Sequence, residues 1–356
     1  MRVEASTETQ VAPKSFEEQF NNPLFVEVNG AQVKVVNLIP EHHESNVPLL
    51  LAPGWSETTD TYKNSLKHIY DQNNRVISLD HPRHGGIPEK YKDIPRAELA
   101  KAQNTIAAIE QSGLKKVDAI THSEASIYVG IAASLRPDLF RNIVFVSPTG
   151  MLLNDNLLKE TGRFGSLSVR EGASLLHDKV RLLSRFINSN IRKRLGKEVK
   201  PYVQGKYKEG MTIEGKKTLT YLHTDREIPN PDSPQPHDIG VIKYVIANPK
   251  RTLAEAHAIT KSNIFESIEK LRELGIGITI VHGVDDPLEP TNAIFEAAAQ
   301  KGEMDSVDGK RKMPTDGYYS VTHGHNTLAR DERYVNAALD ALKGLAQKSE
   351  NKQTTP

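Results

Sequence analysis

A serine lies where an apolar stretch ends and a segment of small residues begins. In "AITHSEASIYVG", residues 119–130, Ser123 follows the apolar run "VDAI" and precedes a helical pattern, and Thr121, Ala125 and Ser126 around it are all small. A serine on a sharp strand-to-helix turn has a strained backbone, and only short neighbours let the strand and the helix come so close. The stretch therefore predicts a candidate nucleophile for acyl transfer, with an ordinary serine at the start of a helix as the alternative.

The elements that would position this serine alternate along the chain as short apolar runs and amphipathic helical patterns. Asn29-Gly30 separates two strand-like runs and predicts a tight hairpin, because this pair supplies the positive φ that a two-residue turn needs. The later alternation predicts a largely parallel sheet with helices on both faces. Strands are expected at 47–54, 75–80, 116–122, 141–148, 276–283 and 317–323, and helices at 60–72, 96–112, from 124, 263–275 and 327–347.

Between residues 151 and 260 the alternation stops, and helical patterns with a Pro-rich stretch replace it. We expect this segment to be a helical cap (lid) inserted between core segments 21–150 and 261–347, with disordered ends at 1–20 and 348–356. The segment has 19 Lys and Arg residues against 12 Asp and Glu residues. This surplus is typical of solvated helix faces, or else it indicates a basic lid over a site for anionic substrates or lipid surfaces.

With this order of elements, "THSEAS" resembles the Gly-x-Ser-x-Gly nucleophile elbow of the α/β-hydrolase fold superfamily. Thr121 and Ala125 stand where the family has its two glycines. The resemblance covers about residues 24–347 and is closest to serine hydrolases of the esterase and lipase type that carry a cap domain. It implies an α/β class chain with a mostly parallel eight-stranded sheet, helices on both faces, a helical cap, and a triad in the chain order serine, acid, histidine.

Two further motifs supply the acid and the base that the resemblance implies. The strand "ITIVHG" runs into "VDDPLEP", which resembles the family's Gly-x-x-Asp turn, so Asp286 is the expected acid and Asp285 the alternative. "SVTHGHNTLA" contains a Gly-His pair like that of the family, so His325 is the expected base and His323 the alternative. The carboxylate would fix the tautomer of the imidazole, and the imidazole would take the serine proton.

The family stabilises the oxyanion with two backbone N–H groups, one after the nucleophile and one in the loop after the third strand. By resemblance these donors are Glu124 and Trp55. The loop "APGWS" resembles the family's His-Gly-x loop, with Pro53 in place of the histidine. Trp55 is the only tryptophan of the chain, and we expect it at the mouth of a pocket.

Composition narrows the class of partner. The 46 basic and 45 acidic residues leave a net charge of +1, which favours a small-molecule substrate over nucleic acid. The chain has no cysteine, and no Gly-rich phosphate loop is present, so no cofactor is expected. Asp80, His81 and His84 lack a third histidine at a useful spacing, so no metal is expected. No apolar run is long enough to span a membrane, and we expect a cytoplasmic protein, with peripheral membrane contact through the basic cap left open.

Together these motifs predict a serine hydrolase that cleaves an ester or related acyl bond of a small molecule through an acyl-enzyme. Two alternatives use the same fold. One is a catalytically silent protein that binds a ligand or a partner in the pocket. The other is a carbon–carbon hydrolase or a cofactor-free perhydrolase that uses the same triad.

Overall fold

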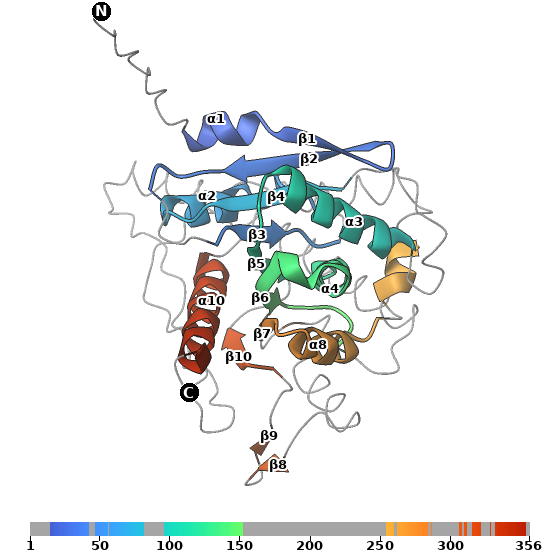
Figure 1. Ribbon diagram of the computed structural model, residues 1–356, viewed down its shortest axis with the longest axis vertical. Coiled ribbons are helices and arrows are strands. Elements are labelled where there is room, and N and C mark those ends of the chain that lie inside the picture. Colours follow the sequence, from blue (N-terminus) through green and yellow to red (C-terminus); the bar gives the residue numbers. More distant parts are fainter. Residues whose placement is uncertain are drawn as a thin grey trace, which may run out of the picture.

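Eight strands form one sheet at the centre of the computed structural model (Figure 1). They are β1 (Leu24–Val28), β2 (Ala31–Leu38), β3 (Leu49–Ala52), β4 (Val76–Asp80), β5 (Val117–His122), β6 (Phe140–Val146), β7 (Gly277–Gly283) and β10 (Gly317–Val321), in the spatial order β1-β2-β4-β3-β5-β6-β7-β10. The pairs β1–β2 and β2–β4 are antiparallel, and every later pair is parallel. The predicted mostly parallel, eight-stranded sheet is therefore confirmed.

The structure describes residues 15–42, 47–55, 57–81, 96–151, 254–259, 262–283, 286, 306–307, 310–311, 315–321, 328 and 332–353. Nearly all of the predicted cap, 151–260, lies outside these ranges, so the cap stays a prediction.

The hairpin at Asn29-Gly30 is confirmed, since both residues have positive φ, 49° and 78°, between antiparallel β1 and β2.

Helices cover both faces of the sheet, as predicted (Figure 1). Two buried hydrophobic clusters lie on the two faces, one under α3, α4 and α8 and the other under α1, α2 and α10. The helices are α1 (Phe16–Asn21), α2 (Lys63–Asp71), α3 (Arg96–Gln111), α4 (Ala125–Leu135), α8 (Ile264–Glu273) and α10 (Glu332–Gln353), with a 3-10 turn at Pro137–Leu139, a short helix at 254–259 and a separate pair of short strands, β8 (Ser306–Val307) and β9 (Lys310–Arg311). Strand β5 is buried along its whole length because it has a helical layer on each side.

Both predicted disordered ends are wrong in part. Residues 16–20 form most of α1, because Ser15 caps this helix with a reciprocal bond to Glu18 and because the rings of Phe16 and Phe20 are buried, with centroids 5.5 Å apart. At the other end, α10 continues through Gln353. The residues after 348 are mostly good helix formers with no glycine or proline before 353, so the helix has no stop signal where we expected one.

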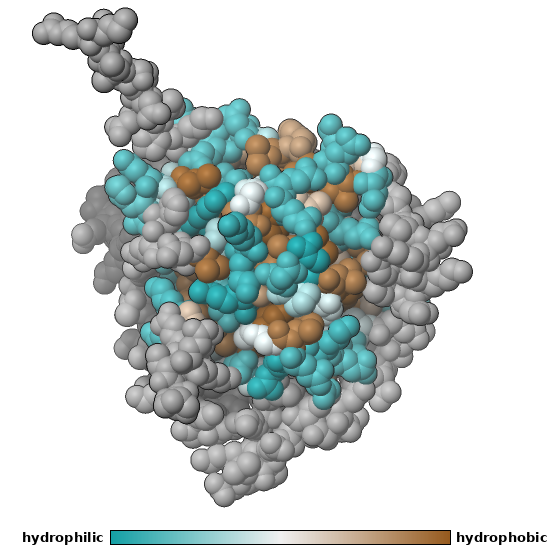
Figure 2. All heavy atoms as spheres, viewed as in Figure 1, coloured by the Kyte–Doolittle hydropathy of each residue, from teal (hydrophilic) through white to brown (hydrophobic). Residues whose placement is uncertain are grey.

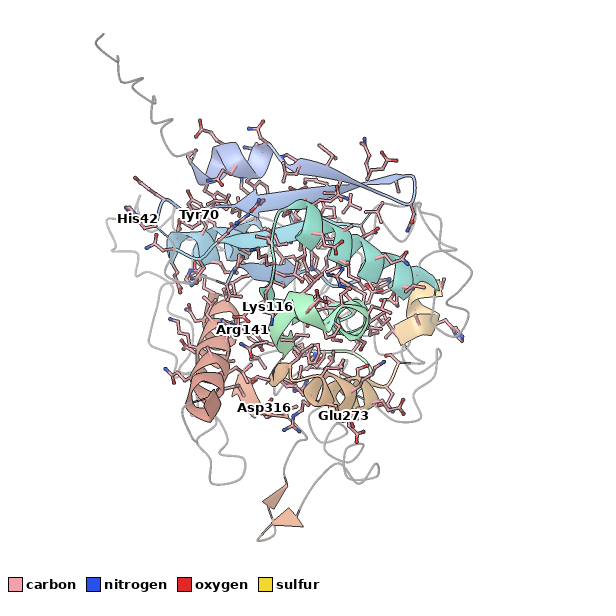
Figure 3. The ribbon with its side chains drawn as sticks, viewed as in Figure 1. His42, Tyr70, Lys116, Arg141, Glu273 and Asp316 are labelled. Atoms are coloured by element: carbon pink, nitrogen blue, oxygen red, sulfur yellow. The ribbon has the colours of Figure 1, made fainter. Side chains whose placement is uncertain are left out.

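Carboxylates at the amino-terminal edge of the sheet hold neighbouring strands together through an ion pair and a backbone hydrogen bond. The guanidinium of Arg141, at the start of β6, pairs with the carboxylate of Asp118 at the start of β5, with Nε 2.9 Å from Oδ1. Asp316, just before β10, accepts the backbone N–H of Ile278 at 2.9 Å; Arg141 and Asp316 are labelled in Figure 3. Because the strands are parallel, their carboxyl ends share the opposite edge, where ligands bind in open α/β sheets and where Ser123 lies.

The face drawn in Figure 2 mixes hydrophilic residues with separate hydrophobic ones. The most exposed large hydrophobic side chain among the described residues is that of Phe25, 63% exposed, on the edge strand β1. In the described part of the chain, no helix combines the length and the apolar character that a membrane span requires.

Candidate functional site

Ser123 lies on the turn between β5 and α4 and has a left-handed backbone, with φ of +51°. This conformation is rare for a residue that has a Cβ. The turn is held on both sides of the residue. The N–H of Ser123 donates to the carbonyl of Val146 on β6 at 3.1 Å, and the carbonyl of Ser123 accepts the hydroxyl of Ser126 at 2.8 Å. Ser123 is 8% exposed, so the serine sits in a tightly packed, strained turn at the carboxyl edge of the sheet.

The two residues that replace the family's glycines, Thr121 and Ala125, are fully buried on either side of this turn. Thr121 is in β5, where its Cα pairs with those of Ala52 and Phe145 on the neighbouring strands. Ala125 is the first residue of α4. The strand-turn-helix therefore forms without glycine at either position.

The loop after β3 is fixed by hydrogen bonds from two directions. The N–H of Gly54 donates to the Glu57 carboxylate at 2.6 Å, and the carbonyl of Pro53 accepts the hydroxyl of Tyr128 at 2.7 Å. A Cβ on Gly54 would lie 2.6 Å from Glu57 Oε2 and 3.1 Å from His122 Nδ1. Any larger residue at 54 would have to displace the Glu57 carboxylate, because the backbone passes directly against these two side chains.

His122, the residue before Ser123, joins this loop to the elbow. Its Nδ1 lies 2.5 Å from the Tyr62 hydroxyl and 3.1 Å from Glu57 Oε2, and the Tyr62 hydroxyl also donates to the Glu57 carboxylate. Burial, and then the charge of Glu57, raise the pKa of Tyr62 well above its ordinary value, so Tyr62 remains a neutral donor. The sequence assigned no role to His122, Glu57 or Tyr62, because nothing in their spacing indicates that the three side chains meet.

Asp286 follows β7 and is 3% exposed. Its N–H donates to the carbonyl of Gly283 at 3.1 Å, and its Oδ2 lies 3.5 Å from Nε2 of His282. The other ring nitrogen of His282 is 3.2 Å from the Tyr318 hydroxyl on β10. Burial, and then Asp286, raise the pKa of Tyr318 above its ordinary value. An Asp in an exposed turn would not be enclosed in this way.

The two expected oxyanion donors also lie at the carboxyl edge. Glu124 is the N-cap of α4, where backbone N–H groups have no partner within the helix and the helix dipole favours negative charge. The Glu124 carboxylate accepts from Lys101 Nζ at 2.6 Å. Trp55 follows Gly54, and its indole Nε1 donates to Glu255 at 3.0 Å. His325, its alternative His323, and Asp285 lie outside the described residues.

Asp80 and His81, weighed as metal ligands in the sequence, have structural contacts instead. Asp80 accepts the N–H of Thr59 at 2.6 Å and pairs with Lys34 at 3.1 Å. The ring of His81 packs edge-on against Tyr128, with centroids 4.7 Å apart. In the part of the chain that the structure describes, no three His, Asp or Glu side chains are grouped so that they could hold a metal ion.

Comparison with known proteins identifies the fold. No family model and no curated protein matches the sequence. One similar solved structure is a bacterial membrane phospholipase A, with a TM-score of 0.55 and 14% sequence identity over 91% of this chain and 86% of that chain. Another is a bromoperoxidase from Bacillus anthracis, with a TM-score of 0.51 and 16% identity over 90% of this chain and 100% of that chain. A third is a thermophilic esterase from Thermogutta terrifontis, with a TM-score of 0.51 and 14% identity over 91% of this chain and 99% of that chain. The chain has the α/β-hydrolase fold.

In the α/β-hydrolase fold, the turn between the nucleophile strand and the following helix is the elbow, and its serine is exposed to substrate at the top of the sheet. In this chain Ser123 lies on the turn after β5 and before α4. At sequence identities of 14–16%, the likeness to these solved structures shows the fold alone.

Proposed function

We propose that this chain is a serine hydrolase that cleaves an ester, or a related acyl bond, of a small molecule. The observation that carries the proposal is the backbone of Ser123, which has φ of +51° at the strand-to-helix turn. A strained residue is kept where the surrounding structure over-determines it, and such residues gather at active sites. The α/β-hydrolase fold supports the same assignment, because this turn is where that fold presents its nucleophile.

In the proposed mechanism, Ser123 Oγ attacks the carbonyl carbon while His325 takes the hydroxyl proton. The oxyanion of the tetrahedral intermediate accepts hydrogen bonds from the N–H groups of Glu124 and Trp55. His325 then returns the proton to the leaving alcohol, and an acyl-enzyme remains. A water molecule, deprotonated by His325, hydrolyses this ester and restores Ser123.

Asp286 is the proposed acid that orients His325. Its burial supports this role, since an enclosed carboxylate holds an imidazolium strongly. Its contact with His282, in turn backed by Tyr318, limits the directions in which the carboxylate can turn. His282 belongs to the buried strand β7, so we assign it a supporting role and not that of the base.

A fluorophosphonate probe tests the proposal directly, because it phosphonylates only an activated serine. We expect one adduct, located on Ser123 by mass spectrometry and lost in Ser123→Ala. Ser134→Ala is the matched control from the following helix, since Ser134 is a partly exposed serine of α4 that lies away from the turn. Absence of an adduct on the wild-type protein would refute the hydrolase and favour the silent ligand-binding alternative, for which the replaced glycines at Thr121 and Ala125 are the supporting observation.

A pair of variants tests the choice of base. Turnover of p-nitrophenyl acetate should fall by about 10³-fold or more in His325→Gln, because the serine then lacks its general base. His323→Gln should stay near wild type. The reverse pattern would transfer the role to His323. Peracid formation from acetate and hydrogen peroxide, measured in the same samples, distinguishes a perhydrolase from an esterase.

A further inference from the structure

Beneath the proposed oxyanion hole lies a buried group of four charged side chains, which we name the Lys101 cluster: Lys101, Glu98, Glu124 and Glu255. Lys101 Nζ is 2.6 Å from a carboxylate oxygen of Glu124, 3.1 Å from one of Glu255 and 3.7 Å from one of Glu98. The Lys101 side chain is 5% exposed, and the three glutamates are more deeply buried still.

The cluster places more negative than positive charge away from water. Burial alone lowers the pKa of Lys101, but the carboxylates of Glu124, Glu98 and Glu255 more than reverse this, so the ammonium stays protonated. Burial, followed by the charge of Glu98, raises the pKa of Glu124 well above its ordinary value. Two uncompensated negative charges are too costly in such a site, so the cluster retains a proton on its carboxylates.

Three elements far apart in sequence meet at this cluster. Glu98 and Lys101 are on α3, Glu124 is the N-cap of α4, and Glu255 is on the helix at 254–259, which lies beside α3 (Figure 1). Apolar side chains would stabilise this part of the core at least as well, because a buried ion pair often contributes less to stability than well-packed hydrophobic residues.

The cluster is connected to both residues that carry the proposed oxyanion donors, Glu124 and Trp55. Glu124 supplies one proposed oxyanion donor through its N–H, and its side chain ends on Lys101. Trp55 supplies the other donor, and its indole N–H donates to one carboxylate oxygen of Glu255 at 3.0 Å. The second carboxylate oxygen of Glu255 is 3.1 Å from Lys101 Nζ. Both donor residues are therefore tied, through their own side chains, to one ammonium group.

A third connection reaches the same loop. Lys101 Nζ lies 5.8 Å from the centre of the Tyr128 ring, and the Tyr128 hydroxyl donates to the carbonyl of Pro53 at 2.7 Å. The peptide group between Pro53 and Gly54 is thus held from α4, while the side chain of Trp55 is held from the helix at 254–259. A shift of Lys101 would be felt at each of these points.

We propose that Lys101 and Glu255 are positioning residues that set the separation of the two oxyanion donors, Glu124 N–H and Trp55 N–H. The inference rests on the proposed hydrolase function. Its physical basis is that an oxyanion hole works only when its donors are fixed before the charge develops, so that no reorganisation is needed in the transition state. Lys101 and Glu255 do not touch the reacting atoms themselves.

The test uses Lys101→Met, which removes the ammonium and keeps the length of the side chain, and a graded pair at Glu255. Glu255→Gln keeps an oxygen that can accept from Trp55, whereas Glu255→Ala removes it. Lys67→Met is the matched control, since Lys67 on α2 is exposed and forms an ion pair with Asp71 four residues later. Turnover of p-nitrophenyl acetate, fluorophosphonate labelling and tryptophan emission are measured on each folded variant.

The proposal predicts that kcat falls by about 10- to 100-fold in Lys101→Met and Glu255→Ala while KM stays within about twofold, because the lost alignment acts only in the transition state. Glu255→Gln should lie between Glu255→Ala and wild type. Trp55, as the only tryptophan of the chain, reports the geometry independently of activity. Its emission should change in Lys101→Met and Glu255→Ala and stay unchanged in Lys67→Met.

An unchanged kcat in folded Lys101→Met and Glu255→Ala would overturn the inference, as would a raised KM with no effect on kcat. If Lys101→Met does not fold, the order of the two Glu255 variants decides. Failure of the underlying function has a different signature, because a wild-type protein that forms no fluorophosphonate adduct refutes the hydrolase before any variant is compared.

Discussion

The strain at Ser123 can be measured by replacing the residue with alanine and with glycine. Both replacements remove the hydroxyl, so their difference in unfolding free energy isolates the Cβ. A left-handed residue with a Cβ is disfavoured by about 1–2 kcal/mol. Two effects oppose this and lower the unfolding free energy of the glycine variant relative to the alanine variant. Glycine gives the unfolded chain more freedom, which costs about 0.5–1 kcal/mol, and it lacks the buried methyl group, which costs about 0.8 kcal/mol. At Ser123, where φ is +51°, the opposing contributions nearly cancel.

We therefore expect Ser123→Gly and Ser123→Ala to unfold within about 0.5 kcal/mol of each other. Ala133→Gly is the matched comparison, because Ala133 is also buried and lies in the right-handed interior of α4. There the same loss of a methyl group has no strain to offset it and should cost about 1.5–2 kcal/mol. Urea unfolding followed by circular dichroism gives both differences. If glycine at 123 costs as much as glycine at 133, the backbone of Ser123 is not strained and does not support Ser123 as the nucleophile.

Three further predictions follow from the surroundings of the elbow. Gly54→Ala should lower kcat for p-nitrophenyl acetate by about tenfold or more, since its Cβ would displace the Glu57 carboxylate 2.6 Å away; normal turnover would contradict this. Thr121→Val should raise the unfolding free energy by about 1 kcal/mol in urea, because the buried Thr121 hydroxyl has no hydrogen-bond partner among the described residues; a loss of stability would argue that the hydroxyl is used. Glu124→Gln should flatten the pH dependence of stability. The raised pKa of Glu124 stabilises the folded chain fully below its unfolded value of 4.5, and this contribution is lost as the pH rises through the folded value. The wild type should therefore lose stability relative to Glu124→Gln by up to about 1.4 kcal/mol per pH unit above 4.5, and parallel curves from urea unfolding would contradict the assignment.

Features carried by local pattern were predictable from the sequence. Hydrophobic periodicity located the strands of the central sheet, and the Asn29-Gly30 pair located the first hairpin, because positive φ is a local requirement. The turn at Ser123 was predictable for the same reason, since a strand, a serine among small residues and a helix are read within about a dozen positions.

The charged network around the site was not predictable, because its members come together only in the folded chain. Lys101 and Glu98 lie in a helix that also carries the exposed Glu110, and Glu255 lies more than 100 residues further along. A glutamate that will be buried has the same letter as one that will be solvated, and only tertiary contacts decide between them. The same holds for Glu57, Tyr62 and His122, where one hydrogen-bonded group spans 65 residues.

The replaced glycines show what the elbow requires physically. A residue at 121 or 125 needs only a side chain small enough for β5 and α4 to approach, and Thr121 and Ala125 are both accommodated with no exposure. The demanding position is Ser123, whose left-handed backbone is held by a hydrogen bond on each side. Its N–H donates to the carbonyl of Val146, and its carbonyl accepts the hydroxyl of Ser126. Because these bonds come from the sheet and from α4, the strain is sustained by the fold itself. Departure from the glycine pattern is therefore compatible with a functional elbow, provided the hydroxyl of Ser123 is activated.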